Sequence, residues 1–200
     1  MTNTDDVLTN KQCIRNKMRD KRSSLAESAL NTAAFELAEH AKSNERLSNA
    51  KKIASYLPSN GEISPIELQN QSHAEFFLPR ITDIKQSQMA FYPASNPLTC
   101  NRYQIWEPVA QGDSQSLEDV DIVLLPLVAF DRSGNRLGMG GGFYDRALSF
   151  KQQSSCAKPY LIGLAHHFQE VSQLPSERWD IPLDAILTDQ QLITIRKIKN

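Results

Sequence analysis

Five of the chain's eight glycines fall within residues 134–142, a density that points to a binding loop. They are Gly134, Gly138, Gly140, Gly141 and Gly142. Consecutive glycines allow positive φ and leave no Cβ between the backbone and a ligand, and successive amides in such a turn can form an anion-binding nest. An apolar run precedes the loop and a helix is expected after it, so the helix N-terminus would add to the attraction. The segment predicts phosphate binding; a glycine-rich turn without a ligand is the alternative.

The two common phosphate-binding fingerprints do not fit this segment. A dinucleotide motif GxGxxG beginning at Gly138 would require glycine at position 143, where the chain has Phe143. A P-loop would end in Gly-Lys followed by Ser or Thr, and the chain has no such triplet. Phosphate binding here would therefore use a different pattern.

Charged side chains beside the glycines indicate how a phosphate would be held. Asp145 would repel phosphate unless a metal lies between them, and Mg²⁺ prefers one or two carboxylates together with phosphate oxygens. Its alternative role is a first-turn acid that stabilises the helix dipole. Arg136 could hold phosphate oxygens through its guanidinium fork, or it could be a solvated loop residue.

The N-terminal segment adds a second group of cations. Residues 11–22 carry six basic side chains against one acid, Asp20. Lys11 and Arg15 are four residues apart, so on a helix they share one face and could clamp a polyphosphate from the side opposite the glycine loop. A solvated helix and a nucleic-acid-binding arm are the alternatives, although the patch is short and lacks interleaved aromatic residues.

The elements that must position these residues alternate between helices and strands. Thr9 or Asn10 can cap a first helix that runs to about Arg22, and residues 24–27 have the capping-box pattern for a second helix to about Lys42. Strands are expected over residues 52–57, 75–78, 89–92, 121–128, 160–165 and 185–188, and shorter helices over 65–71 and from 143 onward.

Prolines and apolar runs define the expected sheet. Pro58, Pro79 and Pro93 are expected to end the first three strands, and residues 93–115 to be rich in loops. The run 121–128 is almost continuously apolar, which is typical of a strand covered on both faces in a parallel sheet. We therefore predict an α/β fold over residues 1–200: one domain, with a layered, largely parallel sheet flanked by helices and two helices at the N-terminus.

Composition excludes several classes of protein. With 200 residues, 40% hydrophobic and 22% charged, the chain is typical of globular domains, and no apolar run is long enough for a transmembrane helix. A net charge of −1 gives no global field that favours nucleic acid or an anionic membrane. Three widely spaced cysteines, Cys13, Cys100 and Cys156, argue against a disulfide framework or zinc site and for reduced thiols.

The N-terminus lacks the pattern of a secretory signal. We accordingly expect a cytoplasmic monomer whose partners are small molecules, with no nucleic-acid or membrane partner.

A set of motifs runs in order along nearly the whole chain. They are Lys11-x-x-x-Arg15, residues 54–58 with Gly61-Glu62, residues 77–80, residues 126–131 with Gly134, residues 136–145 and residues 179–184. Together they resemble the 5-formyltetrahydrofolate cyclo-ligase family, also called the methenyltetrahydrofolate synthetases. The segment 136–145 is the longest and most specific of these matches.

The resemblance implies a reaction. Family members convert 5-formyltetrahydrofolate and ATP, with Mg²⁺, to 5,10-methenyltetrahydrofolate, ADP and phosphate. A formamide carbonyl is a poor electrophile and its oxygen a poor leaving group. Transfer of the γ-phosphoryl group to that oxygen makes an iminium-like phosphate, which N10 attacks as phosphate leaves. The protein's contribution would be positioning and charge neutralisation.

The resemblance also implies roles for individual residues. ATP contacts are expected at Lys11, Gln12, Cys13, Ile14, Arg15, Arg136, Leu137, Gly138, Met139, Gly140, Gly141, Gly142, Phe143 and Tyr144. Of these, Lys11, Arg15 and Arg136 are the expected catalytic residues. Folate contacts are expected at Leu57, Glu62, Met139, Gly140, Gly141, Gly142 and Phe143. Magnesium ligands are expected at Asp145 and Asp180.

Some of these positions have alternative roles. The Glu62 carboxylate can pair with the ring NH and amino group of a pterin; without the resemblance it would be interpreted as a solvated turn acid. Tyr144 could stack on a ring or pack its helix, and Tyr103 and Trp106 could face folate or belong to the core. Met139 stands where some family members have a cationic or aromatic residue, which leaves the folate contact at this position open.

Two other functions stay open at this point. A non-catalytic folate or nucleotide sensor would keep the pocket without turnover, but Lys11, Arg15, Asp145 and Asp180 are all present, which argues against an inactive copy. An RNA-binding module would use the basic helix, but the nearly neutral net charge argues against it. His166 and His167 follow an apolar run and are assigned a structural or solvated role.

Overall fold

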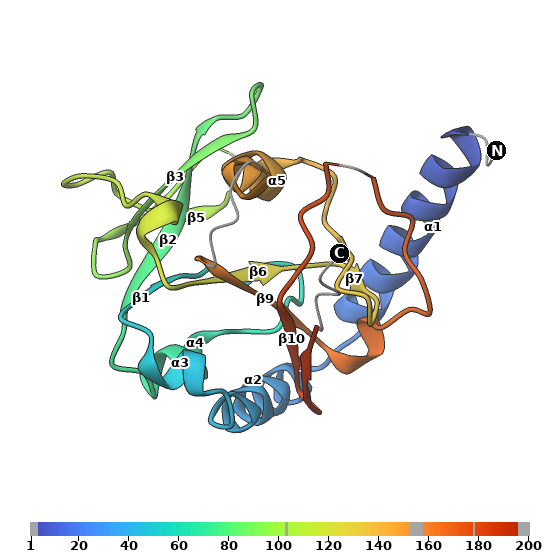
Figure 1. The fold of residues 1–200 in the computed structure, drawn as a ribbon, viewed down its shortest axis with the longest axis horizontal. Coiled ribbons are helices and arrows are strands. Elements are labelled where there is room, and N and C mark those ends of the chain that lie inside the picture. The colour runs from blue at the N-terminus through green and yellow to red at the C-terminus, as the bar shows by residue number, and fades with distance from the viewer. Residues whose placement is uncertain (1–3, 103, 153–157, 178, 196–200) are drawn as a thin grey trace.

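A seven-stranded sheet forms the centre of the fold, in the order β11-β10-β9-β6-β1-β2-β3 (Figure 1). The computed structural model describes residues 4–102, 104–152, 158–177 and 179–195. The strands of this sheet are β1 (Lys52–Ala54), β2 (Glu75–Asp83), β3 (Gln88–Pro93), β6 (Ile122–Pro126), β9 (Tyr160–Ala165), β10 (Ala185–Thr188) and β11 (Leu192–Thr194). Neighbouring strands from β10 to β2 are parallel, and the edge strands β11 and β3 are antiparallel. The predicted, largely parallel sheet is confirmed.

Helices cover both faces of the sheet. They are α1 (Thr4–Ser23), α2 (Glu27–Ala41), α3 (Glu45–Asn49), α4 (Ile66–Asn70) and α5 (Phe143–Ala147), with 3-10 turns η1 (Leu117–Asp119), η2 (Ser149–Gln152) and η3 (His167–Gln169). In Figure 1, α2, α3 and α4 lie together on one side of the sheet and α5 lies on the other. Two hairpins complete the fold: β4 (Leu98–Cys100) with β5 (Trp106–Pro108), and β7 (Ala129–Phe130) with β8 (Arg136–Leu137).

The central strand β6 is buried on both faces, as its apolar run predicts. Ile122 and Leu124 pack in the cluster beneath α2, α3 and α4, whereas Val123 and Leu125 pack on the opposite side, in the cluster that includes Leu148 after α5. This alternation follows from the two-residue period of a strand. Each fully buried leucine contributes about 2 kcal/mol of burial free energy, so β6 is a stable element from which the neighbouring loops extend.

The order of the strands creates a crevice beside β1. The chain passes from β1 through α4 to β2 on one side, and later returns to place β6 on the other side of β1. Where the strand order reverses in this way, the loops after adjacent strands diverge, and ligands of α/β proteins bind beyond the carboxyl ends of those strands. The segments after β1 and β6 therefore form the expected binding edge.

The two N-terminal helices are present, but their ends differ from the prediction. The first helix begins at Thr4, before the predicted cap at Thr9 or Asn10. The N-cap of α2 is Ala26, with no side-chain cap. The Ser24 hydroxyl instead donates a hydrogen bond to the Lys21 carbonyl at 2.8 Å. Ser24 thus satisfies an unpaired carbonyl at the end of α1, and the predicted capping box is wrong.

Strand β2 continues through Pro79 instead of ending there. Pro79 pairs with Phe91 in the antiparallel β2–β3 ladder, whereas β1 pairs with β2 only as far as Phe77. Beyond Phe77 the strand has a partner on one side only, and such an edge tolerates the missing N–H of proline. The first strand is also shorter than predicted, ending at Ala54, and the loop-rich segment 93–115 contains the hairpin β4–β5.

Candidate functional site

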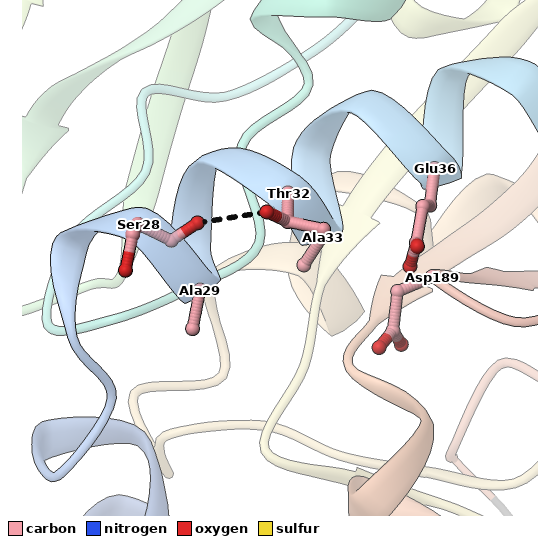
Figure 2. A pocket seen from close by; sticks show the side chains of 6 residues that line it. All are labelled: Ser28, Ala29, Thr32, Ala33, Glu36 and Asp189. Atoms are coloured by element: carbon pink, nitrogen blue, oxygen red, sulfur yellow. Dashed lines mark hydrogen bonds between the residues drawn. The ribbon is translucent and has the colours of Figure 1, made fainter.

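A cavity of about 860 Å³ opens at the carboxyl ends of β1, β2 and β6. Its walls come from α1, the segment after β1, strand β5, the glycine loop with α5, and the residues around Asp180. This volume lies within the range of small-molecule sites, and the position is the crevice that the strand order creates. A smaller hollow of about 310 Å³ beside α2 (Figure 2) contains none of the predicted site residues.

The glycine loop forms one wall of the cavity and joins β8 to α5. Gly140 and Gly142 have φ values of 100° and 67°, a region that glycine adopts without the strain other residues incur. Gly142 is the N-cap of α5. The turn before the loop is organised by the buried carboxylate of Asp131, which accepts hydrogen bonds from the amides of Ser133 and Asn135 at 2.9 and 3.1 Å. The loop is thus held between two ordered elements.

Helix α1 brings its cations to this loop. Arg15 Nε donates a hydrogen bond to the Gly138 carbonyl at 2.9 Å, and Lys11 Nζ lies 4.0 Å from Asp180 Oδ2. Both side chains line the cavity, on the helix face that their spacing predicts. The structure therefore places two cations beside the glycine loop, where they can neutralise an anionic ligand.

The three residues between these cations do not line the cavity. Gln12 and Cys13 are exposed, and Ile14 packs with Val128 and Leu137 in a separate apolar cluster. Their predicted ATP contacts therefore have no support from the side-chain arrangement: within one helical turn, only the first and last residues of Lys11-x-x-x-Arg15 face the cavity.

Arg136 and Asp145 are paired at the edge of the cavity. Arg136 Nη2 lies 2.5 Å from Asp145 Oδ1, and Arg136 Nη1 donates to the Ile181 carbonyl at 2.6 Å. The side chain of Arg136 is 6% exposed, so it is not a solvated loop residue. The guanidinium offsets the negative charge of Asp145, which reduces the repulsion that this carboxylate would exert on a phosphate.

Asp145 and Asp180 both line the cavity and supply hard oxygen donors. Asp180 Oδ2 accepts a hydrogen bond from the Glu177 amide at 2.8 Å, which fixes its position. Across the part of the chain that the structure describes, no three His, Cys, Asp or Glu side chains form a metal-binding group. Two carboxylates suit Mg²⁺, which commonly completes its coordination with phosphate oxygens and water. The donor set therefore fits a magnesium ion bound together with a nucleotide.

Glu62 lines the same cavity in a largely buried position. Its Oε2 accepts hydrogen bonds from the Ser59 amide at 3.0 Å and the Ser59 hydroxyl at 3.4 Å. Its Oε1 lies 3.8 Å from Arg22 Nη1, and the Glu62 side chain is 12% exposed. Burial raises the pKa of Glu62, opposed by the Ser59 amide and by Arg22. Glu62 is therefore not a solvated turn acid.

Aromatic side chains are concentrated at this cavity. Trp106 and Trp179 line it and are 57% and 63% exposed, so of the two alternatives for Trp106, packing in the core is wrong. Tyr144 both lines the cavity and packs against the core cluster near α5, and burial raises its pKa. Tyr103 lies outside the described residues. The exposed tryptophan rings offer flat apolar surfaces to a ligand.

Several residues of the site carry no recognisable signal in the sequence. Ser59 holds Glu62, and Arg22 lies beside it. Glu107, a buried cavity residue, accepts hydrogen bonds from the Asn101 side chain at 3.0 Å and from the Ile81 amide at 3.3 Å. Of Ser59, Arg22 and Glu107, only Arg22 belongs to a recognisable sequence pattern, the basic segment 11–22. That pattern predicted a residue on the surface.

The remaining expectations concern residues outside the cavity. His166 is buried, and its Nε2 lies 3.1 Å from the Gly61 carbonyl, which agrees with a structural role. Cys13 and Cys100 carry free thiols; Cys156 lies outside the described residues. None of the helices in the described ranges is long and apolar enough to cross a membrane.

Comparison with known proteins connects this site to one family. Residues 7–189 match the model of the 5-formyltetrahydrofolate cyclo-ligase family. A 5-formyltetrahydrofolate cyclo-ligase of Haemophilus influenzae is 37% identical over 183 residues, covering 88% of this chain and 96% of that protein. The Escherichia coli protein of the same name is 38% identical over 149 residues, covering 72% and 80%. The NMR structure of Aquifex aeolicus 5,10-methenyltetrahydrofolate synthetase superposes with a TM-score of 0.78 at 31% identity and covers 95% of each chain.

Proposed function

The chain belongs to the 5-formyltetrahydrofolate cyclo-ligase family, and we propose that it converts 5-formyltetrahydrofolate and ATP, with Mg²⁺, to 5,10-methenyltetrahydrofolate, ADP and phosphate. It is an enzyme of the ligase class. The observation that carries the proposal is that one cavity combines the glycine loop and its neighbouring cations, Lys11 and Arg15, with the largely buried carboxylate of Glu62. A polyphosphate and a pterin with hydrogen-bond donors require these two kinds of surface.

The triphosphate of ATP would lie against the glycine loop. Arg15 and Lys11 would face its oxygens from α1, and the exposed amides of the loop would donate to them from the other side. Arg136 would act mainly by holding the loop edge and Asp145, since its guanidinium is already bonded to Asp145 and the Ile181 carbonyl. Charge-assisted hydrogen bonds of this kind are about twice as strong as neutral ones.

The folate would lie between Glu62 and the aromatic mouth of the cavity. Glu62 Oε2 is held by Ser59, which leaves Oε1 to accept from the ring NH and amino group of the pterin. Leu57 and Trp106 line the same cavity and would contact the apolar faces of the ligand. The segment Met139–Phe143 would face both substrates, because it lines the cavity beside Arg15 and because Met139 Sδ lies 3.9 Å from Nη2 of Arg22, the residue next to Glu62.

This arrangement suits phosphorylation of the formyl group. The formyl oxygen attacks the γ-phosphorus as the bond to ADP breaks, which activates the formyl carbon. N10 then attacks that carbon and loses its proton, and the carbon–oxygen bond breaks to release inorganic phosphate. Holding the two ligands in contact lowers the entropic cost of both steps. The cations compensate the charge that develops on the phosphoryl oxygens.

Asp145 and Asp180 would hold the magnesium ion together with the nucleotide. When bound, Mg²⁺ supplies positive charge to the phosphate oxygens. Asp180 is oriented by the Glu177 amide and Asp145 by Arg136. These protein contacts fix the carboxylates before any ligand binds.

The test is a reaction of the protein with 5-formyltetrahydrofolate, Mg²⁺ and ATP, in which the absorbance of the conjugated methenyl product and the release of ADP are followed. We expect one ADP for each product molecule and no product without ATP. Folate binding without turnover at high protein concentration would instead identify a non-catalytic sensor.

A further inference from the structure

Arg22 is a buried cation that no part of the proposed reaction uses. It lies in the last turn of α1, and its side chain is 1% exposed. Within the described residues, its Nε and Nη1 have no hydrogen-bond partner. A charge in such a position is unfavourable unless an opposite charge lies nearby. Among the residues that the structure describes, the acid paired with it is Glu62, with Nη1 at 3.8 Å from Oε1.

The separation of Arg22 and Glu62 has a chemical consequence. At 3.8 Å the two groups attract each other but do not share a hydrogen bond. Glu62 lines the cavity and Arg22 does not, so the guanidinium acts from behind the carboxylate. Arg22 thus supplies positive charge while Oε1 stays available to accept a hydrogen bond from a ligand.

The surrounding backbone fixes this pair in place. Gly61 has a φ of 71°, and a Cβ there would lie 2.8 Å from the Arg22 carbonyl oxygen, so only glycine allows the turn to approach the helix. The Gly61 carbonyl in turn lies 3.1 Å from Nε2 of buried His166. Arg22 Nη2 also lies 3.9 Å from Met139 Sδ in the glycine loop. The end of α1 therefore contacts both the Glu62 turn and the glycine loop.

We infer that Arg22 is a positioning residue that keeps the Glu62 carboxylate ionised and directed at the donor edge of a folate pterin. The inference rests on the proposed folate role of Glu62 and adds the residue through which that role is maintained. An ionised carboxylate accepts from two pterin donors at once, whereas a protonated one presents a competing O–H. Arg22 favours the ionised form by its charge.

Other titratable groups also face this pair. Tyr56 and Tyr144 lie near Glu62, and the charge of Glu62 adds to burial in raising the pKa of both tyrosines. Burial opposes ionisation of Glu62 itself. Arg19 and His166 lie near Arg22. Against these, Arg22 and Ser59 are the groups that favour the ionised carboxylate. Removal of Arg22 should therefore raise the pKa of Glu62.

The experiment compares Arg22→Met and Arg22→Lys with the full-length wild-type protein. Both of the chain's tryptophans line the cavity, so quenching of intrinsic fluorescence by 5-formyltetrahydrofolate reports binding without requiring turnover. We expect Arg22→Met to weaken folate binding about tenfold or more at neutral pH. We also expect the acid limb of the binding profile to move to higher pH. Arg22→Lys, which keeps the charge, should retain most of the wild-type profile.

Two controls separate this role from a general effect on folding. Lys17→Met removes an exposed cation from the same helix and should leave the pH profile of folate binding unchanged. In a Glu62→Gln background, which itself weakens folate binding, Arg22→Met should add less than about a twofold further effect, because the two residues act as a unit. If Arg22→Met does not give the circular dichroism spectrum of the folded protein, Arg22→Gln is used for the same measurements.

The inference would be overturned if the acid limb of the folate-binding profile had the same pH in Arg22→Met or Arg22→Gln as in the wild type. It would also be overturned if Arg22→Met weakened folate binding by the same factor in the Glu62→Gln background as in the wild type. Absence of turnover by the wild-type protein is a different result. It would contradict the proposed activity, but the pH profiles of folate binding would still show whether Arg22 acts through Glu62.

Discussion

In the proposed arrangement, single side chains decide which substrate each part of the cavity binds. Asp145 is paired with Arg136, and Lys11 lies near Asp180, so each acid of the proposed metal site has a cation beside it. The two members of each pair offset each other's charge, and Arg15 adds a further cation beside the glycine loop. Removal of either an acid or a cation should therefore affect the nucleotide side and leave the folate side largely unchanged.

Asp145→Ala should lower kcat at saturating folate by about 100-fold, because it removes a proposed magnesium ligand and the partner of Arg136. Turnover is measured over a range of Mg²⁺ concentrations. Asp113→Ala, which removes an exposed carboxylate outside the cavity, is the matched control and should have wild-type activity. Equal activity of Asp145→Ala and wild type at every Mg²⁺ concentration would exclude the metal role.

Lys11→Ala should raise KM for ATP about tenfold, the effect expected for loss of one charge-assisted hydrogen bond, with KM for folate little changed. Lys17→Ala removes an exposed lysine from the same helix and serves as the control. Initial rates at varied ATP and saturating folate give the comparison. An increase in KM for folate alone would show that Lys11 contacts the folate and not the nucleotide.

Residue-level prediction succeeded where local spacing carries the information. The four-residue spacing of Lys11 and Arg15 places both side chains at the cavity. It could not show that Arg22, in the same basic segment, is buried against Glu62, because that contact joins residues far apart in sequence and depends on how α1 meets the Gly61 turn. The sequence likewise does not show that Arg136 pairs with Asp145, because the pair depends on the path of the glycine loop between β8 and α5.

Short elements carry the site, and the glycine loop depends on backbone conformation. Gly142→Ala should lower the free energy of unfolding by about 1 kcal/mol, because Gly142 has a φ of 67° as the N-cap of α5. Gly142→Asn should lower the free energy of unfolding by less, since asparagine tolerates a positive φ. Gly138→Ala is the control, because φ there is not positive and a Cβ would meet nothing within 4 Å. Urea unfolding of the three variants measures the difference; equal losses at positions 138 and 142 would contradict the account.

Asp121 joins three strands at the edge of the sheet remote from the cavity. It accepts hydrogen bonds from the amides of Lys51, just before β1, and of Lys52, the first residue of β1, and it pairs with Lys158 before β9. The hydrogen bond from Lys158, with those two amides, lowers the pKa of Asp121 from 3.8 to about 2.

A pKa below that of the unfolded chain stabilises the fold above about pH 3.8, and this stabilisation is lost as pH falls toward about 2. Allowing for solvent screening at this partly exposed site, Asp121→Asn should cost about 1 kcal/mol at neutral pH and almost nothing near pH 2. Thermal melts over this pH range give the test, with Asp119→Asn, an exposed neighbour, as the control. A cost that did not depend on pH would show that the charge is not responsible.

Element-level prediction was most accurate for the buried strands. Continuous apolar character identified β6, and the predicted residues 160–165 and 185–188 coincide with β9 and β10. Proline was a poorer guide: β2 continues through Pro79 because the strand has a free edge there, which a sequence does not reveal. Ser24 likewise fits two helix ends, and only the structure shows that it bonds to the end of α1.

At the level of the whole molecule, the strand order explains why residues from both ends of the chain meet. The reversal at β1 opens the crevice, α1 closes it from the N-terminal side, and the segment around Asp180 closes it from the C-terminal side. Alternating helices and strands predicted the α/β class. The place of the site within the sheet needed the pairing of β1 with both β2 and β6, which is not encoded in local patterns.

The central claim is that this one cavity joins ATP to the formyl oxygen of the folate. It is tested most directly with 5-formyltetrahydrofolate that carries ¹⁸O in the formyl group, followed by mass analysis of the inorganic phosphate released with Mg²⁺ and ATP. If the formyl oxygen attacks the γ-phosphorus, each phosphate molecule carries one ¹⁸O atom and an equal amount of methenyl product forms. Methenyl product with unlabelled phosphate, or labelled folate recovered unchanged, would contradict it.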